Sequence, residues 1–168
     1  MPKTTVNFAS LCMDNVTYKA NTDSTKKLAY KNSKFFRAVK GYGLFGGDFL
    51  NNDGTAGESI YGMTYRDESF EISHDSRYLL SITKPRATPH TSNSQFMIAL
   101  SPLKWLDYRY QVFGRVAPVS QPLVDKLESD IGTKAWDQFE PPLIDVKVTN
   151  CSIQDPDSWI IVEPVVSL

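Results

Sequence analysis

Short apolar runs that favour β-strands recur along the chain and alternate with polar, turn-rich segments. The clearest are residues 78–83 (YLLSIT), 95–100 (QFMIAL) and 110–117 (YQVFGRVA), which are short enough to be buried strands. Residues 144–150 (IDVKVTN) alternate apolar with polar side chains, as a half-buried strand does. Several short strands with few helices predict an antiparallel barrel or sandwich.

Two segments predict helices instead. In residues 2–12, Pro2 suits the first turn of a helix. In residues 120–131, apolar side chains recur every four residues on one face, after a serine that is suited to the N-cap. Residues 13–27 are polar and turn-rich and are predicted to be a connection, and residues 28–39 again favour a strand.

Composition narrows the class of protein. The length of 168 residues fits one domain, and the net charge of −1, with scattered Lys and Arg, argues against nucleic-acid binding. Cys12 and Cys151 are expected to be unpaired thiols, and with two histidines and no C-x-x-C pair a metal site is not expected. No apolar stretch reaches the roughly 18 residues of a membrane span. No secretory signal is evident at the start, which favours a soluble intracellular protein without naming a compartment.

Residues 35–50 (FFRAVKGYGLFGGDFL) place one arginine between aromatic side chains and a glycine pair. Residues 51–62 (NNDGTAGESIYG) form a glycine-rich loop that lacks the lysine of a phosphate-binding loop. Further along the chain stand SNSQFMIAL, KWLDYRYQVFGRV and IDVKVTNCSI. In this order, together with PKTTVNFASLC near the start, these motifs resemble the cyclophilins, a family of peptidyl-prolyl cis-trans isomerases.

The resemblance implies a mostly-β fold, an antiparallel β-barrel capped by two α-helices. Residues 1–154 would form the cyclophilin-like domain and residues 155–168 a C-terminal extension. In the family two strands precede the first helix, and here that hairpin is missing, which would leave a barrel edge with unpaired backbone groups. Either a strand formed by the extension (SWIIVEP) or a strand from a partner protein would fill the gap.

The implied chemistry is rotation about the X–Pro peptide bond, whose barrier of about 18–20 kcal/mol comes from amide resonance. No bond breaks, so no nucleophile, metal or cofactor is needed. An apolar pocket holds the proline ring, and a donor stabilises the twisted state in which the prolyl nitrogen regains its lone pair. Arg37 matches the family's catalytic arginine, and a guanidinium with fixed donors suits that role.

The resemblance also assigns substrate-binding positions. Gln95, Trp105 and Leu106 are as the family has them. At other positions the residue type differs: Gly43 replaces a methionine and is expected to remove a pocket wall, and Phe45 replaces the glutamine that orients the arginine. The remaining assigned positions are Tyr42, Thr83, Lys84, Met97 and Tyr110.

Two classes of function follow from these residues. One is an isomerase with an eroded, weak site acting on proline-containing protein segments. The other is a non-catalytic cyclophilin-like subunit of a larger protein assembly. A third possibility, intermediate between these two, is a domain that binds a proline-containing segment without isomerising it. Arg37 supports the first, and the missing hairpin supports the second.

Overall fold

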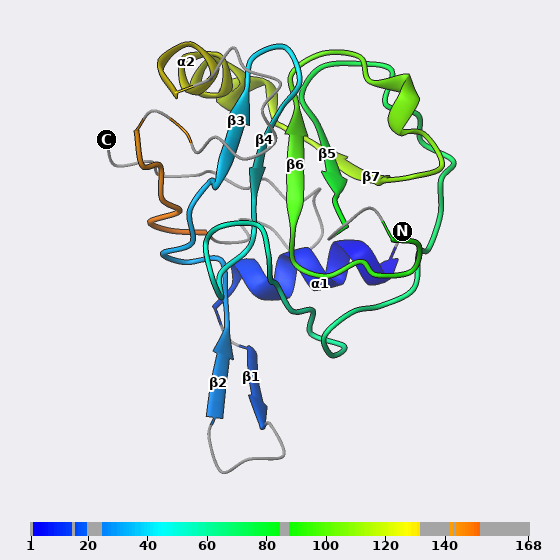
Figure 1. The fold of residues 1–168 in the computed structure, drawn as a ribbon, viewed down its shortest axis with the longest axis vertical. Helices are drawn as coiled ribbons and strands as arrows, with labels where there is room; N and C mark the ends of the chain where they lie inside the picture. Colours follow the sequence, from blue (N-terminus) through cyan, green and yellow to red (C-terminus); the bar gives the residue numbers. More distant parts are fainter. Residues whose placement is uncertain are drawn as a thin grey trace.

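The structure of the chain is a computed structural model that describes residues 2–14, 16–19, 25–84, 88–131, 142 and 144–151. Its centre is a five-stranded antiparallel sheet in the order β3-β4-β6-β5-β7. Helix α1 (Pro2–Cys12) crosses one end of the sheet and helix α2 (Gln121–Ile131) lies at the other (Figure 1). The described part is therefore mostly β with two helices, as predicted.

The strands of this sheet are short. Their bounds are Arg37–Val39 for β3, Gly43–Gly46 for β4, Leu79–Ile82 for β5, Phe96–Ala99 for β6 and Gln111–Arg115 for β7. A change of register between Leu80 and Ser81 interrupts the pairing of β5 with β7. Two 3₁₀ helices, η2 (Lys104–Leu106) and η3 (Pro118–Ser120), lie on either side of β7 in the chain.

The predicted helices and the three apolar strands are confirmed within a few residues of their expected bounds. The predicted side-chain alternation of segment 144–150 is present from residue 146: Val146 and Val148 are buried and Lys147 between them is exposed, whereas Ile144 is 50% exposed. It is attached to the chain before β3 by one β-bridge, Lys34 to Lys147, and by the Phe35 N–H, which donates to the Val146 carbonyl at 3.0 Å.

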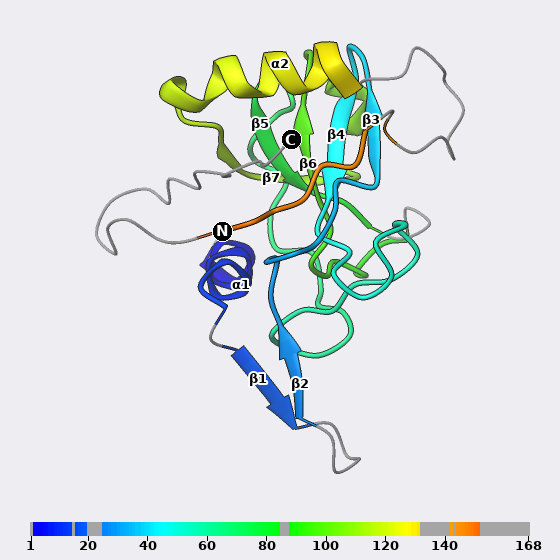
Figure 2. The same cartoon turned by 90° about the vertical axis from the view of Figure 1, so that its left-hand side faces the viewer.

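Residues 13–27 are not the simple connection that their polarity predicts. Strands β1 (Val16–Lys19) and β2 (Thr25–Leu28) pair there as an antiparallel hairpin. The hairpin projects away from the sheet, beyond α1 (Figures 1 and 2). The prediction was wrong because pairing between the two short runs, each with a β-branched residue, outweighs their polar composition.

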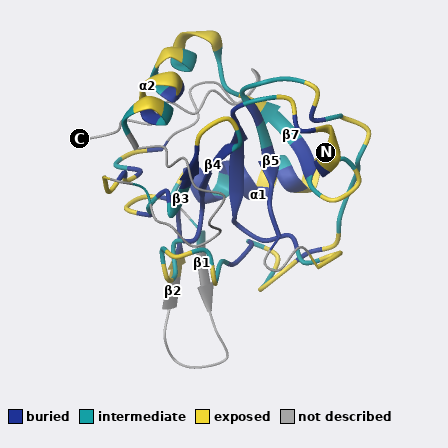
Figure 3. Cartoon of the chain, turned by 45° about the horizontal axis from the view of Figure 1, so that its top comes forward, coloured by how far each residue is buried: buried dark blue, intermediate teal, exposed yellow. Residues whose placement is uncertain are grey.

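The sheet buries both of its faces. One face packs against the helices through a core that includes Phe8, Leu11, Leu44, Phe96, Ile98, Val124 and Leu127. The alternate residues of the same strands point to the opposite face, because successive side chains of a strand alternate. Strands β4 and β5 are accordingly dark blue along most of their length (Figure 3).

Cys12 and Cys151, which are 139 positions apart in sequence, form a disulfide with their Cα atoms 4.9 Å apart. Both side chains are buried. The expectation of unpaired thiols was wrong because the pairing depends on the packing of the 144–151 segment against the end of α1. Spacing in the sequence contains no information about that contact.

The sheet does not close into a barrel within the described residues, where nothing pairs with the outer edge of β7. Helix α1, which begins at Pro2, is the first described element of the chain. The extension 155–168 lies outside the described residues. Neither described helix has the length and apolar character needed to cross a membrane.

Candidate active site

Strand register sets Arg37, Phe45 and Met97 in one row across the sheet. Arg37 on β3 is paired with Phe45 on β4, and Phe45 is paired with Met97 on β6. Residues directly opposite one another in a sheet project to the same face. The row therefore lies on the face that does not pack against the helices.

An apolar cluster surrounds this row. Phe45, Met97 and Leu106 form its buried part, with Tyr42 and Tyr110 packed against them. Five of the predicted substrate-binding residues thus lie together. Trp105 joins the same group by stacking on the Tyr42 ring, with ring centroids 5.5 Å apart and planes 28° apart. Its side chain is 56% exposed, so it forms an outer wall that a bound peptide can reach.

The Arg37 guanidinium is held by ring faces. Its carbon lies 4.9 Å from the centre of the Phe45 ring and 5.6 Å from that of Tyr42. The Nε atom is covered by protein and finds no acceptor among the described residues. Phe45 therefore offers a cation–π contact, worth roughly 0.5–2 kcal/mol, where the family's glutamine would accept a hydrogen bond.

Gly43 does not leave the gap that its replacement of methionine predicts. A Cβ atom at Gly43 would lie 2.9 Å from the terminal methyl of Met97 and 3.2 Å from the Ile98 carbonyl oxygen. The Met97 side chain, which is fully buried, already occupies that space. The wall is supplied from the neighbouring strand, and Met is flexible enough to fill such a gap.

The Arg37 guanidinium is the charged group of the cluster, and the two tyrosines beside it are neutral. Burial raises the pKa of Tyr42 to about 12; the neighbouring Tyr110 adds to the shift and the Arg37 charge opposes it. Burial also raises the pKa of Tyr110, against the opposing charges of Arg37 and Arg109. Both phenols are neutral at physiological pH, so neither competes with a substrate for the guanidinium as an anion.

His74, Ser81 and Asp107 form a buried relay that the sequence analysis did not assign to the site. His74 Nε2 lies 2.9 Å from Ser81 Oγ, and His74 Nδ1 lies 2.9 Å from an Asp107 carboxylate oxygen. The order resembles a hydrolytic triad, but Ser81 is fully buried, so no substrate reaches its hydroxyl. The role that fits the burial is structural.

The relay anchors the turn that carries two of the site residues. The Asp107 carboxylate accepts hydrogen bonds from the His74 N–H at 2.8 Å and from the Ser73 hydroxyl at 2.6 Å. The Leu103 N–H donates in turn to the His74 carbonyl at 2.7 Å. Helix η2, with Trp105 and Leu106, lies between these two attachments. Only the spatial contact marks these residues, since Asp107 is 33 positions from His74 in sequence.

Thr83, Lys84 and Gln95 lie at one end of β5 and β6, outside the aromatic cluster. The Thr83 N–H donates to the Gln95 carbonyl at 3.1 Å, and the Thr83 hydroxyl oxygen is buried without a partner among the described residues. The Gln95 side-chain amide donates to the carbonyls of Gly54 and Ala56. It therefore holds the glycine-rich loop, and its substrate contact stays a prediction.

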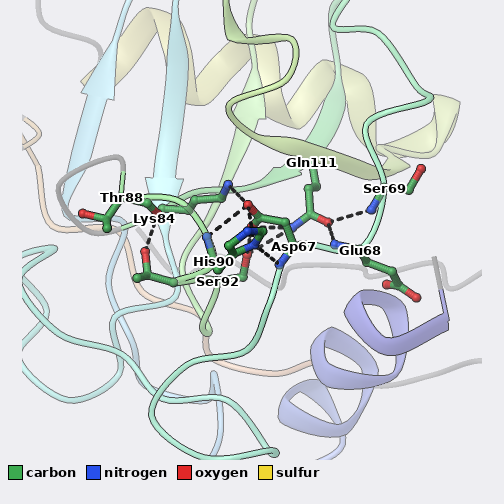
Figure 4. Close-up of polar contacts among 9 residues, drawn as sticks. Asp67, Glu68, Ser69, Lys84, Thr88, His90, Ser92 and Gln111 are labelled. Carbon is green, nitrogen blue, oxygen red and sulfur yellow. Dashed lines mark hydrogen bonds and ion pairs between the residues drawn. The ribbon is translucent and has the colours of Figure 1, made fainter.

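Lys84 is committed to an internal network rather than open to solvent. Its ammonium group lies 2.7 Å from an Asp67 carboxylate oxygen, with the two side chains 3% and 5% exposed. Ser92 and Gln111 also donate to Asp67 (Figure 4). Gln111 in addition accepts from the Glu68 and Ser69 N–H groups. A buried charge is tolerated when it is paired and hydrogen-bonded in this way. A direct substrate contact by Lys84 stays a prediction.

Asp48 and Gly47 stabilise the backbone at the start of the glycine-rich loop. The buried Asp48 carboxylate accepts hydrogen bonds from several backbone N–H groups of the loop that follows, including those of Asn51 and Gly54 at 2.9 Å each. Gly47 has a φ of +90°, and a Cβ there would lie 2.3 Å from the Ser94 carbonyl oxygen. No other residue fits. Among the described residues, no three His, Cys, Asp or Glu side chains are grouped to hold a metal ion.

The sequence model of the family described as cyclophilin type peptidyl-prolyl cis-trans isomerase/CLD matches residues 1–153. The chain belongs to this family. It is 37% identical over 157 residues to "Peptidyl-prolyl cis-trans isomerase D" of Kluyveromyces lactis, with 94% of the chain covered. It is 38% identical over 151 residues to "Peptidyl-prolyl cis-trans isomerase cyp11" of Rhizopus delemar, with 90% covered. It is also 37% identical over 154 residues to the human "NK-tumor recognition protein", again with 90% covered.

The chain spans only part of each of these relatives. The matched region makes up 40% of the Kluyveromyces protein, 42% of the Rhizopus protein and 10% of the human protein. Similarity therefore extends to the cyclophilin-type domain and not to the remainder of those proteins.

Proposed function

We propose that the chain catalyses cis-trans isomerisation of X–Pro bonds in proline-containing protein segments, with weak turnover. The proposal rests on the surroundings of the Arg37 side chain. Its guanidinium stands on two aromatic rings beside an apolar cluster, and its Nε–H is unused by any described residue. Arg37 as a whole is only partly buried, and no described carboxylate pairs with its guanidinium, so the guanidinium can donate to a ligand.

The arrangement supplies what amide rotation requires. The cluster of Met97, Leu106 and neighbouring rings accepts a proline ring, and the exposed Trp105 borders it. As the peptide bond twists, resonance is lost and the prolyl nitrogen becomes a hydrogen-bond acceptor. A guanidinium next to that nitrogen stabilises the twisted state more than either planar isomer, which lowers the barrier.

Weak turnover follows from how Arg37 is held. Phe45 provides a ring face, which leaves the guanidinium free to slide, whereas an accepting side chain would fix its direction. The lost orienting hydrogen bond is worth about 1 kcal/mol, close to a tenfold reduction in rate. Gly43 adds little to this loss, because Met97 fills the space beside it.

The test is isomerisation of a short X–Pro peptide, followed by NMR exchange, with the wild type, Arg37→Ala and Arg37→Lys. We expect Arg37→Ala to lower kcat/KM by about 100-fold, the typical effect of removing a preorganised donor. We expect Arg37→Lys to recover little, since a point charge lacks the fork of donors. The matched control is Arg66→Ala, which removes an exposed arginine and should leave the rate unchanged.

The second candidate is a non-catalytic subunit of a protein assembly, and the open edge of β7 is what favours it. A free strand edge is a known attachment point for an extended segment. Absence of isomerisation in folded wild type, with no difference between wild type and Arg37→Ala, would leave this second function in place of the first.

A further inference from the structure

The free edge of β7 borders an apolar groove. The groove has a volume of about 530 Å³ and runs between α1 and β7, where Phe8, Ile72, Val112 and Phe113 line it. Ile72 is 52% exposed. An uncovered edge strand beside exposed apolar side chains is an aggregation hazard that folded proteins normally cover. The described residues provide no cover for this one.

A smaller cavity continues from the groove into the core. It shares Phe8, Leu80 and residues 115–117 with the groove, and its far wall includes Val148 and Cys151. Cys151 is the last described residue of the chain. It is tied to Cys12 by the disulfide. The chain beyond Cys151 therefore continues from a fixed residue that lines the same cavity as residues 115–117, at and just after the end of β7.

The sequence after Cys151 suits an edge strand. Residues 158–163 (SWIIVE) consist mainly of aromatic and β-branched residues, the types that strands favour. Pro164 follows and would end the pairing, because proline has no N–H to donate. The intervening residues 152–157 reach about 20 Å when extended, which covers the length of the short β7 strand.

Charge favours the same occupant. Arg115 is exposed at the groove, and its side chain donates to Ser76 without an ion pair to any described carboxylate. Asp155, Asp157 and Glu163 flank the apolar residues of the tail. A tail that lies along β7 would bring these carboxylates close to Arg115.

We propose that residues 158–163 of this chain pair antiparallel with the outer edge of β7 and fill the apolar groove. The direction follows from the starting point, because Cys151 shares its cavity with residues 115–117, at and just after the end of β7. The tether raises the effective concentration of the tail to the millimolar range, so a modest intrinsic affinity is enough. The extension thus covers the edge of β7 that no described residue pairs with.

Amide hydrogen exchange of β7 reports this pairing directly. The Val116 N–H donates to the Tyr78 carbonyl at 2.8 Å and so faces β5. Backbone groups of successive strand residues alternate in direction, so the Arg115 N–H faces the free edge. In the full chain we expect the Arg115 N–H to exchange at least tenfold more slowly than after deletion of residues 155–168. The Val116 N–H is the internal control and should be equally protected in both.

A second variant guards against a deletion that fails to fold. The double substitution Ile160→Asp and Val162→Asp keeps the chain length and should expose the Arg115 N–H in the same way. A synthetic peptide of residues 155–168 added to the deleted chain should bind and restore protection at Arg115. If either variant unfolds, the Val116 N–H loses its protection from exchange as well. The peptide should then restore protection at both the Arg115 and the Val116 N–H.

The groove itself is tested in the deleted chain. Ile72→Asp should weaken binding of the peptide at least tenfold, whereas Met63→Asp, at a 78% exposed apolar residue that does not line the groove, should leave it unchanged. Equal exchange at Arg115 with and without the tail, together with no binding of the peptide, overturns the proposal. The proposal is also overturned if protection of the Arg115 N–H in the full chain falls when the protein is diluted. That result would mean that a second copy of the chain, in a dimer, fills the groove.

Discussion

The disulfide allows a prediction whose size follows from chain topology. It joins residues 139 apart, so breaking it releases nearly the whole chain from one closed loop in the unfolded state. The loop-entropy relation gives a stabilisation of about 5 kcal/mol for a loop of this length, as an upper value, and measured effects are typically about 2–4 kcal/mol. We expect reduction to lower the free energy of unfolding by an amount in this range.

The assay is urea denaturation followed by circular dichroism, with and without a thiol reductant. The matched control is Cys12→Ala with Cys151→Ala, which should be as unstable as the reduced wild type and should not respond to the reductant. Thiol titration of the unfolded, unreduced protein should find no free thiol. Two titratable thiols, or equal stability before and after reduction, would refute the reasoning and return both cysteines to the unpaired state that their number predicts.

Two further predictions concern the buried relay. Ser81→Ala removes the partner of His74 Nε2 and should lower the free energy of unfolding by about 1–3 kcal/mol, the cost of an unsatisfied buried polar group. Ser76→Ala, at a more exposed serine, should cost little in the same denaturation assay. Burial raises the pKa of Asp107, but hydrogen bonds from His74 and Ser73 outweigh it and the pKa is lowered. Its contribution to stability is thus complete above the pKa of about 3.9 of an unfolded Asp and is lost as the pH falls further. Asp107→Asn should therefore be less stable than wild type at pH 6, with the difference shrinking at pH 3, and a constant difference would contradict the assignment.

Local patterns were sufficient for the elements and for the position of the arginine. Pro2 located the first helix, a four-residue spacing of apolar residues located the second, and short apolar runs located the three buried strands. Motif order placed Arg37, Phe45 and Met97, and antiparallel register then aligned them on one face. These motifs specify local backbone geometry, which a short sequence pattern can encode.

The features that were missed all depend on contacts between distant segments. The β1–β2 hairpin forms within a polar stretch, since pairing between short runs rather than composition decides it. The disulfide depends on the meeting of the two ends of the domain. The filling of the space at Gly43 depends on the rotamer of Met97 on another strand. A substitution considered by residue type alone leaves out a neighbouring side chain that occupies the same space.

The position of each feature in the sheet makes the two proposals separable. Arg37 lies on β3, the first strand in the sheet order, and the open edge belongs to β7, the last. Three strands stand between them, and substitutions that share no partner usually act independently. Arg37→Ala should therefore lower the rate of isomerisation about 100-fold without changing exchange of the Arg115 amide. Loss of the tail should expose that amide while Arg37 keeps its contacts with Phe45 and Tyr42. If both substitutions changed both readouts equally, the common cause would be global unfolding, and protection at Val116 would reveal it.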